Sequence, residues 1–485
     1  MVFLPDAKLN VGKSRVLLIA TAIFRRRDES DRRWRIIWGC RALGGCHTPE
    51  STSKPTIPMS DIQPVYITTN GQAKRYSGDF QTLSEYERPW QRVLKDAYGL
   101  ADVRCACRGP GPKRLAVKHY EGSGAFALAK FALSGHEHAA DCQYYSSSDG
   151  LGGTGGSSAG VLDVQADGSV RIRLEIGMTV REGIEPDCAS APADRPDRPG
   201  STRQSAIKLA GLLHYLWDAA TLNQWRPYWT GKRNARQVFW RLNQAADDVT
   251  AGNVKLGDQL LLPAITADSP EAVRNRARVV VALAAKRRML IIAPLASYSA
   301  EREERMLKDL AISGFHGIPK AFMRPGQWQM LNTRYRTAVA GWRAGQTTLA
   351  IAQVEVRERA GRQSASVIDV ALMAVSKHWI PTESSHEWLI AEKLVDEGRA
   401  FNKPLRYNQA QDIVFPDFVL TDCASGEVPM EVFGRTDEDY LKRKNEKTVY
   451  YDKKYGTGGW WCWDATASNL VPAFPLQARP KNEPK

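Results

Sequence analysis

The chain has 485 residues, more than the roughly 100–200 of one typical domain, and this length predicts about two to four domains. With 43% hydrophobic and 25% charged residues, the composition excludes a collagen-like or a globally disordered protein. Lys and Arg number 67 against 53 Asp and Glu, a formal net charge of +14, which favours an anionic partner such as nucleic acid or an acidic membrane surface.

Residues 1–58 have an erratic composition, no sustained periodicity and a Ser-, Thr- and Pro-rich end. Their apolar run, residues 16–24, is far shorter than the roughly 20 residues of a membrane span. Three arginines follow this run, whereas a secretory signal carries its positive charge before it. We therefore expect a disordered leader, a functional start at Met59, a cytoplasmic location and no membrane partner.

Four candidate metal ligands follow in two pairs. Cys105 and Cys107 are separated by one residue, and His138 and Cys142 by three. Three thiols and one imidazole form the ligand set of a closed tetrahedral zinc site. Because four protein ligands leave no open position for water, such a zinc ion would be structural.

A β-hairpin predicted over residues 114–120 and 125–131 would return the chain so that the two ligand pairs meet. His136 is a competing imidazole, and the alternative is two buried cysteines with solvent-facing histidines. Eight cysteines in the whole chain suit a reducing cytoplasm with a metal site better than a disulfide framework. We expect residues 59–145 to form a zinc-binding β-hairpin module.

Residues 146–202 are predicted to be a linker that contains one β-hairpin. Residues 146–160 are almost wholly Ser, Gly and Asp, and residues 186–199 are rich in Pro and Asp, so both stretches should be flexible. Between them, two short apolar strands flank an Asp-Gly turn at Gly168, which is typical of a hairpin.

Residues 203–378 are predicted to be a central mixed α/β domain. Apolar residues recur at helical spacing in residues 209–220 and 328–342, whereas residues 289–293 and 347–356 resemble strands.

Aromatic and basic residues alternate in residues 225–241 of this block, and such a mixture can stack on bases and neutralise phosphates. The alternative is that the tryptophans belong to the core, because an apolar helical face continues through this segment. The chain has no P-loop, dinucleotide fingerprint or Gly-x-Ser-x-Gly motif, which argues against nucleotide hydrolysis and serine-esterase chemistry.

The last block, residues 380–478, is predicted to run helix, strand, strand, helix, strand. The predicted elements are residues 387–397, 413–421, 428–433, 440–451 and 460–463. A five-residue hairpin loop at residues 422–426 would place Asp417 directly opposite Glu431. Two such carboxylates repel unless a cation lies between them, as in a Mg²⁺ site. The alternative is that each faces solvent or pairs with a nearby Lys or Arg.

Pro416-Asp417 on one strand and Glu431 on the next, preceded by a helix that carries Glu387, resemble the PD-(D/E)XK nuclease superfamily. The position two after the second acidic residue is usually Lys in that superfamily and is Phe433 here. The pattern is similar to members in which the lysine lies on the following helix, here Lys447.

This resemblance implies a restriction-endonuclease-like α/β domain over residues 380–478. It implies that Asp417 and Glu431 hold Mg²⁺, that Lys447 assists catalysis, and that Glu387 completes the site. The alternative for Lys447 is a solvated basic helix. For Glu387 it is a capping box, in which Ser384 is the N-cap and Glu387 reaches back to its amide.

Four segments, Cys105-Ala-Cys107 and residues 138–142, 212–217 and 412–434, carry a second resemblance, which covers nearly the whole chain from Met59 onward. That stretch resembles a bacterial domain-of-unknown-function family, number 1173, that is associated with plasmids and integrative mobile elements. We therefore expect a cytoplasmic, multidomain α/β protein that associates with the DNA of a bacterial mobile element. Either it is a Mg²⁺-dependent nuclease that hydrolyses phosphodiester bonds, or it is a non-catalytic DNA-binding or scaffold protein with a structural zinc site.

Overall fold

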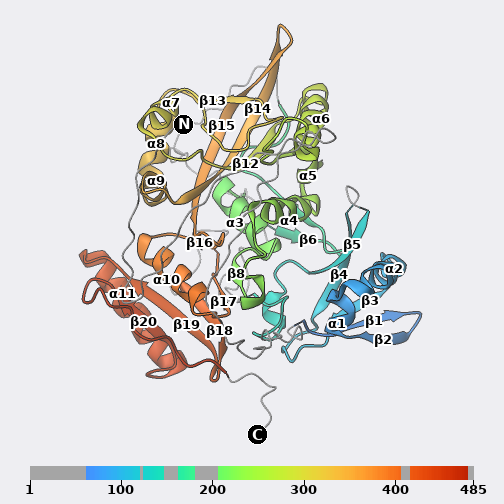
Figure 1. The fold of residues 1–485 in the computed structure, drawn as a ribbon, viewed down its shortest axis with the longest axis vertical. Coiled ribbons are helices and arrows are strands. Elements are labelled where there is room, and N and C mark those ends of the chain that lie inside the picture. Colours follow the sequence, from blue (N-terminus) through green and yellow to red (C-terminus); the bar gives the residue numbers. More distant parts are fainter. Residues whose placement is uncertain (1–61, 121–123, 147–161, 181–205, 406–414, 479–485) are drawn as a thin grey trace, which may run out of the picture. The chain divides into compact units, whose positions relative to one another are not determined.

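The computed structural model describes residues 62–120, 124–146, 162–180, 206–405 and 415–478. The chain divides into two units, residues 1–56 and 57–485, and every described residue belongs to the second. This part is a mixed α/β protein with 11 α-helices and four sheets (Figure 1). The predicted leader, the Pro-rich stretch and all but Ser146 of the Ser/Gly/Asp-rich stretch lie outside the described residues.

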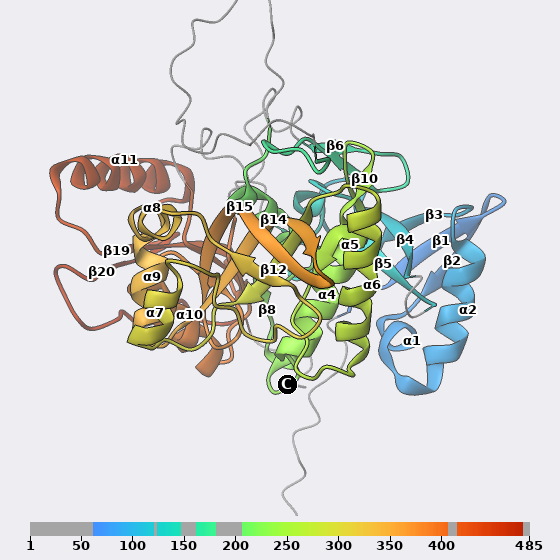
Figure 2. The ribbon, with the colours of Figure 1, turned by 90° about the horizontal axis from the view of Figure 1, so that it is seen from above.

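The first sheet is antiparallel and has the order β2-β1-β3-β4-β5. Its strands are β1 (Val65–Thr69), β2 (Gln72–Tyr76), β3 (Asp102–Cys105), β4 (Arg114–Tyr120) and β5 (Ala125–Lys130), and two helices accompany it, α1 (Gly78–Thr82) and α2 (Glu87–Ala97). Trp90, Leu94 and Ala97 fall on one face of α2 and are buried, because residues three and four apart share a helix face. Gln91 of α2 exchanges two hydrogen bonds with the main chain of Phe126 in β5. Figures 1 and 2 show α2 beside the strands of this sheet. The hairpin predicted over residues 114–131 is present as β4 and β5.

The hairpin predicted near Gly168 is also present, as β6 (Leu162–Val164) and β7 (Val170–Ile172). It does not stand alone, because β7 pairs in parallel with β9 (Val249–Ala251), which in turn pairs with β10 (Val254–Lys255). The hairpin therefore shares a sheet with strands of the central block.

The third sheet has the order β11-β12-β14-β15-β13, with β16 paired to β15. Its strands are β11 (Leu260–Leu261), β12 (Met289–Pro294), β13 (Lys320–Phe322), β14 (Thr347–Arg359), β15 (Arg362–Val375) and β16 (Pro381–Thr382). Alternate residues of a strand face opposite sides of a sheet. Accordingly, Leu349 and Ile351 of β14 lie in one hydrophobic core, and Ala350 and Ala352 lie in another.

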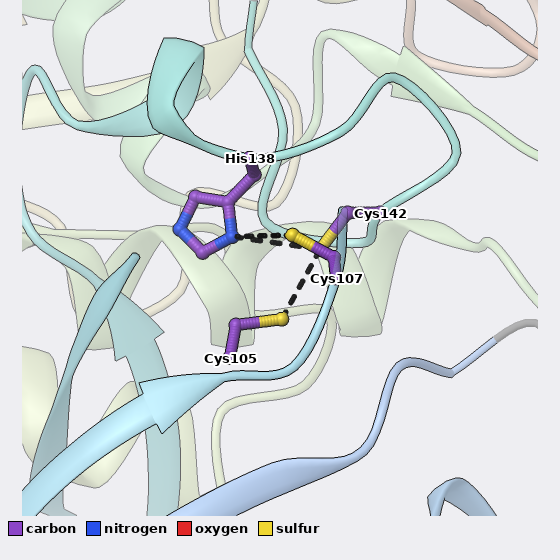
Figure 3. A group of neighbouring side chains, drawn as sticks. All are labelled: Cys105, Cys107, His138 and Cys142. Atoms are coloured by element: carbon purple, nitrogen blue, oxygen red, sulfur yellow. Dashed lines mark hydrogen bonds between the residues drawn. The ribbon is translucent and has the colours of Figure 1, made fainter. Parts of the chain in front are cut away.

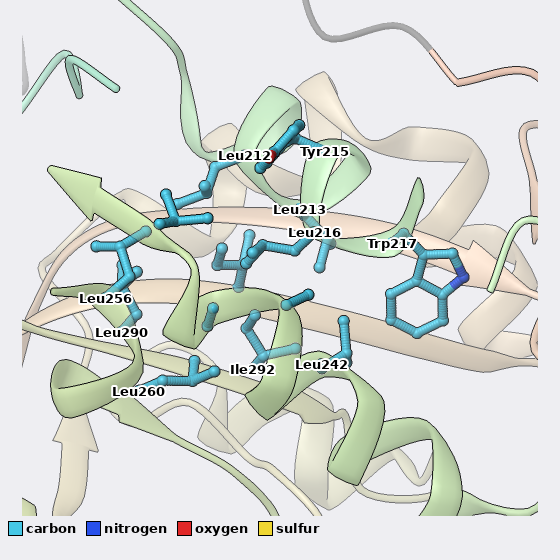
Figure 4. Packing of buried hydrophobic residues seen from close by; sticks show 14 of the residues in the cluster. Leu212, Leu213, Tyr215, Leu216, Trp217, Leu242, Leu256, Leu260, Leu290 and Ile292 are labelled. Atoms are coloured by element: carbon cyan, nitrogen blue, oxygen red, sulfur yellow. The ribbon is translucent and has the colours of Figure 1, made fainter. Parts of the chain in front are cut away.

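Helices cover both faces of this sheet. The first core includes side chains of α3 (Leu209–Ala219), α4 (Ala235–Asp247) and α5 (Leu256–Gln259). The second core includes side chains of α6 (Pro270–Ala284), α8 (Gln327–Arg334) and α9 (Arg336–Arg343). Met306, the residue after α7 (Ala300–Arg305), also belongs to the second core. Figure 4 shows the leucines of α3 beside Leu290 and Ile292 of β12.

Three of the four elements predicted in the central block are present, as α3, β12 and β14. The fourth, a single helix over residues 328–342, is wrong. Two helices stand there, separated at Tyr335, whose backbone leaves the helical region (φ −114°, ψ 36°). The apolar spacing continues across this break, so the sequence pattern does not reveal it.

The fourth sheet has the order β20-β19-β18-β17-β8, and α10 (Ser385–Asp396) and α11 (Glu438–Tyr455) accompany it. Its strands are β8 (Gln224–Trp225), β17 (Phe401–Asn402), β18 (Phe418–Cys423), β19 (Gly426–Phe433) and β20 (Trp461–Asp464). β19 and β20 are parallel and are joined through α11, whereas the other pairs are antiparallel. Its edge strand, β8, comes from the block predicted as the central domain.

The β18–β19 pairing has the predicted register from Phe418, which pairs with Met430, to Leu420. Asp417 immediately precedes β18, outside this pairing, and its amide donates a hydrogen bond of 2.9 Å to the carbonyl oxygen of Met430. The predicted five-residue loop is wrong, because β18 continues to Cys423 and β19 begins at Gly426, with a register shift between Leu420 and Cys423. Gly426 has φ +96°, a conformation that glycine adopts at little cost in such a tight turn. In the described part of the chain, no helix is long and apolar enough to cross a membrane.

Candidate metal centre and carboxylate site

The four candidate metal ligands of the N-terminal region come together (Figure 3). The Sγ atoms of Cys105 and Cys142 are 3.6 Å apart, and His138 Nδ1 lies 3.6 Å from Cys107 Sγ and 3.6 Å from Cys142 Sγ. All four ligand atoms lie within 4.8 Å of one another, and all four residues are buried. His136, the competing imidazole, is not part of the cluster.

These separations fit a metal ion better than a disulfide. In a tetrahedral site with zinc–sulfur bonds of about 2.3 Å, neighbouring sulfurs lie about 3.8 Å apart. A disulfide requires an S–S distance of about 2.0 Å, whereas Cys105 Sγ and Cys142 Sγ are 3.6 Å apart. The cluster could therefore hold a metal ion, and its donor set is compatible with zinc.

A glycine allows the two halves of the cluster to approach. Cys105 ends β3, and the chain beyond Cys107 passes directly against the segment that carries His138. A Cβ atom at Gly109 would lie 2.2 Å from the carbonyl oxygen of Glu137, so only glycine fits there. The carboxylate of Glu137 accepts a hydrogen bond of 2.8 Å from the amide of Lys113, which joins the two segments.

Hydrogen bonds within the cluster favour thiolates. The hydrogen bond with Cys142 lowers the pKa of Cys105 to about 6 and that of Cys107 to about 4, although burial opposes both shifts. The hydrogen bonds with Cys105 and Cys107 raise the pKa of Cys142, so this thiol keeps its proton. Thiolate is the form of cysteine that binds metal.

A buried arginine connects the Cys/His cluster to the fourth sheet. The guanidinium of Arg226 donates hydrogen bonds to the main-chain oxygens of residues 140–142, at 3.4, 3.3 and 2.6 Å. Gln224 Nε2 donates to the carbonyl oxygen of Tyr145, at 2.5 Å. Because Gln224 belongs to β8, the edge strand of the fourth sheet, the cluster loop is anchored directly on that sheet.

The carboxylate site lies on the fourth sheet, where Asp417 immediately precedes β18 and Glu431 belongs to the neighbouring strand, β19. Asp417 Oδ2 accepts a hydrogen bond of 2.8 Å from the amide of Val432, and Glu431 is only 1% exposed. Burial and the negative charge of Asp417 raise the pKa of Glu431 to about 8, although Lys447 and Tyr451 work in the opposite direction.

Two residues of α11 hold Glu431. Lys447 Nζ lies 2.9 and 2.8 Å from its two carboxylate oxygens and 3.1 Å from the carbonyl oxygen of Phe415. The Tyr451 hydroxyl donates to Glu431 Oε1, at 2.8 Å. Lys447 and Tyr451 are four residues apart and so share one helix face. Arg443, four residues before Lys447 in α11, is exposed.

Glu387 lies in the first turn of α10 and forms a second acid–base pair, with Lys403. Its Oε2 atom is 2.9 Å from Lys403 Nζ and accepts a hydrogen bond of 3.0 Å from the amide of Glu383. The predicted capping box is thus half correct. Ser384 caps the helix by accepting from the amide of Glu387, but the carboxylate of Glu387 reaches the amide before Ser384 and not that of Ser384 itself.

Lys403 is a site residue that the sequence did not indicate. It follows the two-residue strand β17 and is 2% exposed. Burial works to lower its pKa, but the charges of Glu387 and Asp417 outweigh burial and hold the pKa above the usual lysine value. Burial raises the pKa of Glu387 to about 7.

The site therefore consists of Asp417 beside two acid–lysine pairs, Glu387–Lys403 and Glu431–Lys447. The charge of Asp417 acts on both glutamates. The three carboxylates are not as close together as the Cys/His ligands, which form the one such cluster within 4.8 Å among the described residues. Each buried glutamate has a lysine as its counter-ion.

The tryptophan-rich segment, residues 225–241, contributes mainly to the interior at its start. Trp225 is buried, and the guanidinium of Arg233 lies 4.0 Å from the ring centroid of Trp229 and 5.1 Å from that of Trp225. Arg233 also donates hydrogen bonds to the carbonyl oxygens of Leu222 and Gln224. Burial lowers its pKa to about 9. Arg233 therefore stabilises this part of the fold.

Comparison with known families identifies the chain. The family described as "Protein of unknown function (DUF1173)" matches residues 79–466, a span that contains both the Cys/His cluster and the carboxylate site. The chain belongs to this family. No curated protein and no solved structure matches it.

Proposed function

We propose that this protein is a Mg²⁺-dependent nuclease that hydrolyses phosphodiester bonds in DNA, with residues 380–478 as a PD-(D/E)XK-like domain. The observation that carries the proposal is that the carboxylate of Asp417 binds the amide of Val432, the residue after Glu431, while Lys447 of the next helix is bonded to Glu431. The helix of Glu387, the strand that follows Asp417, the strand of Glu431 and the helix of Lys447 follow one another along the chain in the order that the resemblance implies.

Asp417 and Glu431 would hold the Mg²⁺ ion. Burial and the charge of Asp417 raise the pKa of Glu431, and a bound cation would offset the repulsion between the two carboxylates. Bound Mg²⁺ supplies a Lewis acid that can activate water and stabilise the attacked phosphate. Lys447 supplies a positive charge beside Glu431. Glu387 and Lys403 form a second ion pair, on which the charge of Asp417 also acts.

Charge on α11 supports DNA as the substrate. Lys442, Arg443 and Lys453 are exposed on the helix that also carries Lys447. Exposed cations beside the site attract the phosphate backbone, and each phosphate contact releases counterions. The net charge of +14 acts in the same direction over longer distances.

The Cys/His cluster would hold a structural Zn²⁺ ion, since three thiols and one imidazole leave no open position. Free cysteines elsewhere in the described residues, Cys423 and Cys462, agree with a reducing cytoplasm. A cytoplasmic nuclease of plasmids and integrative mobile elements is the setting that we propose.

A second function is favoured by one specific observation. Both glutamates already have lysine counter-ions without a metal ion. A non-catalytic DNA-binding or scaffold protein could keep such a site purely as part of its fold.

A cleavage assay separates the two functions. The full chain and its Asp417→Ala form are incubated with single-stranded, double-stranded and branched DNA in Mg²⁺, Mn²⁺ or EDTA. We expect metal-dependent cleavage by the wild type and none by Asp417→Ala, with DNA binding retained by both. Binding without cleavage on every substrate and with either metal would establish the binding protein instead.

A further inference from the structure

A cavity of about 530 Å³ lies among the N-terminal sheet, α3, α4 and the turn at Pro227–Trp229. Its volume falls within the roughly 300–1,000 Å³ that is typical of small-molecule sites. Its walls come from the chain on both sides of the first linker, and it contains none of the residues of the carboxylate site or the Cys/His ligands. Figure 1 labels the elements that surround it, β4, β5, α3 and α4.

We propose that this cavity binds a nucleotide through its base, either as a free nucleotide or as one unit of a nucleic-acid strand. The proposal does not depend on cleavage at the carboxylate site. It rests on three features of the wall, namely unpaired amide donors, flat aromatic rings and a positive balance of charge.

The unpaired donors are two glutamine amides. Gln244 of α4 is 9% exposed, and its Nε2 atom is buried without a hydrogen-bond partner. Gln143 Nε2 is also buried without a partner, and both glutamines line the cavity. An unsatisfied buried donor costs about 1–3 kcal/mol. A ligand that presents hydrogen-bond acceptors to both amides would remove this cost, and the edge of a nucleobase carries such acceptors.

Aromatic rings provide surfaces for stacking. Trp240 lines the cavity although half of the residue is exposed, and its ring centroid lies 6.3 Å from that of Tyr120. Trp229, which is partly buried, lines another part of the wall. Base–aromatic stacking contributes about 1–3 kcal/mol per base, and the combination of flat rings with amide donors suits a nucleobase better than an aliphatic ligand.

The charges of the wall favour an attached phosphate. Lys118 pairs with Asp248 at 3.2 Å, and Lys130 pairs with Asp218 at 3.3 Å. Arg241 is the additional cation that lines the cavity, and its guanidinium lies 5.9 Å from the ring centroid of Trp229. The wall of the cavity therefore has one net positive charge, and Arg241 carries it close to a ring on which a base can stack.

The test is a calorimetric titration of the full chain. The probes are the four deoxynucleoside monophosphates and, separately, single-stranded homo-oligonucleotides. We expect at least one probe to bind, and we expect Gln244→Leu to weaken that binding at least ten-fold. Its melting temperature should not fall, because the Gln244 amide nitrogen has no partner to lose. Trp240→Ala, a change at a half-exposed ring, should also weaken binding.

The matched control is Gln237→Leu, which changes an exposed glutamine of the same helix and should bind as the wild type does. Asp417→Ala should also bind normally, which separates this site from the proposed nuclease site. Binding of monophosphates would identify a free nucleotide as the ligand, and binding of oligonucleotides alone would identify a base within a strand. No binding of any probe at millimolar concentration, or equal binding by Gln244→Leu and Gln237→Leu, would overturn the proposal.

Discussion

The Cys/His cluster and the carboxylate site both bury ionisable groups, but they neutralise charge differently. In the cluster, the thiols and the imidazole face one another at 3.6 Å. In the carboxylate site, Lys403 and Lys447 bind the two buried glutamates directly. The cluster could therefore hold a metal ion among its four ligands, whereas the carboxylate site has lysine counter-ions of its own. This difference predicts a permanent ion at the first site and a labile ion at the second.

The largest expected effect is the loss of the ion from the cluster. Cys107→Ser removes one of four ligands, so we expect the metal to be lost and the free energy of unfolding to fall by about 4 kcal/mol or more, since a closed metal site contributes directly to folding. Elemental analysis and urea unfolding measure the two quantities. Cys462→Ser, at an exposed cysteine outside the cluster, is the control and should leave both unchanged. Purified, unchelated wild-type protein without a stoichiometric metal ion would contradict this half of the comparison.

The next effect concerns Lys447 in the carboxylate site. Lys447→Ala removes a cation beside the proposed metal, and we expect the cleavage rate to fall about 10²–10³-fold. Single-turnover cleavage assays measure this rate. Lys442→Ala, at an exposed lysine of the same helix, is the matched control. Lys444 is a poorer control because its ammonium pairs with Asp464. Equal rates in the Lys442 and Lys447 variants would show that Lys447 has no part in catalysis.

The acidity of Glu431 gives a pH-dependent prediction. Its pKa is about 8 in the folded protein, against an ordinary value of 4.5. Between these values the folded protein keeps a proton that the unfolded chain has lost, so stability falls as the pH rises. In metal-free buffer we expect Glu431→Gln to lose less stability than the wild type between pH 5 and pH 8, by on the order of 2 kcal/mol. Urea unfolding at both pH values measures the difference.

Glu446→Gln, at an exposed position of α11, is the control and should keep the pH dependence of the wild type. If Glu431→Gln also keeps it, Glu431 is not the protonated group.

The smallest expected effect concerns the link between the two regions. Arg226→Gln removes hydrogen bonds to the main-chain oxygens of residues 140–142 and should cost about 1–2 kcal/mol. Because that loop carries His138 and Cys142, we expect a chelator to remove the metal faster from the variant than from the wild type. An unchanged rate of metal release would show that the cluster does not depend on its anchor on β8.

The sequence predicted local features of both regions well. The spacing of Cys105, Cys107, His138 and Cys142, together with one hairpin, was enough to place four ligands in one cluster. The register of β18 and β19 from Phe418 to Leu420 is the one that the sequence predicted, although the turn is tighter than expected. Such features depend on residues that are close in sequence or joined by one hairpin.

Features that depend on distant segments were missed. Lys403 follows β17, and Gln224 and Trp225 form β8. Neither strand was predicted, because a strand of two residues is too short to show any periodicity. β15 (Arg362–Val375) was not predicted either, because its largely buried second half is a continuous apolar run that does not alternate. The ion pair of Lys403 with Glu387 forms only when α10 and the residue after β17 pack together.

The most direct test of the account is reversible metal dependence measured on one sample. Wild-type protein is treated briefly with EDTA, transferred to Mg²⁺ without added zinc, and assayed for DNA cleavage while its zinc content is measured at each step. We predict that cleavage stops in EDTA and returns with Mg²⁺, while one zinc ion per chain is retained throughout. Cleavage that returns only when zinc is supplied, or no cleavage before treatment on any DNA substrate, would contradict the assignment of a structural metal to the cluster and a catalytic one to the carboxylates.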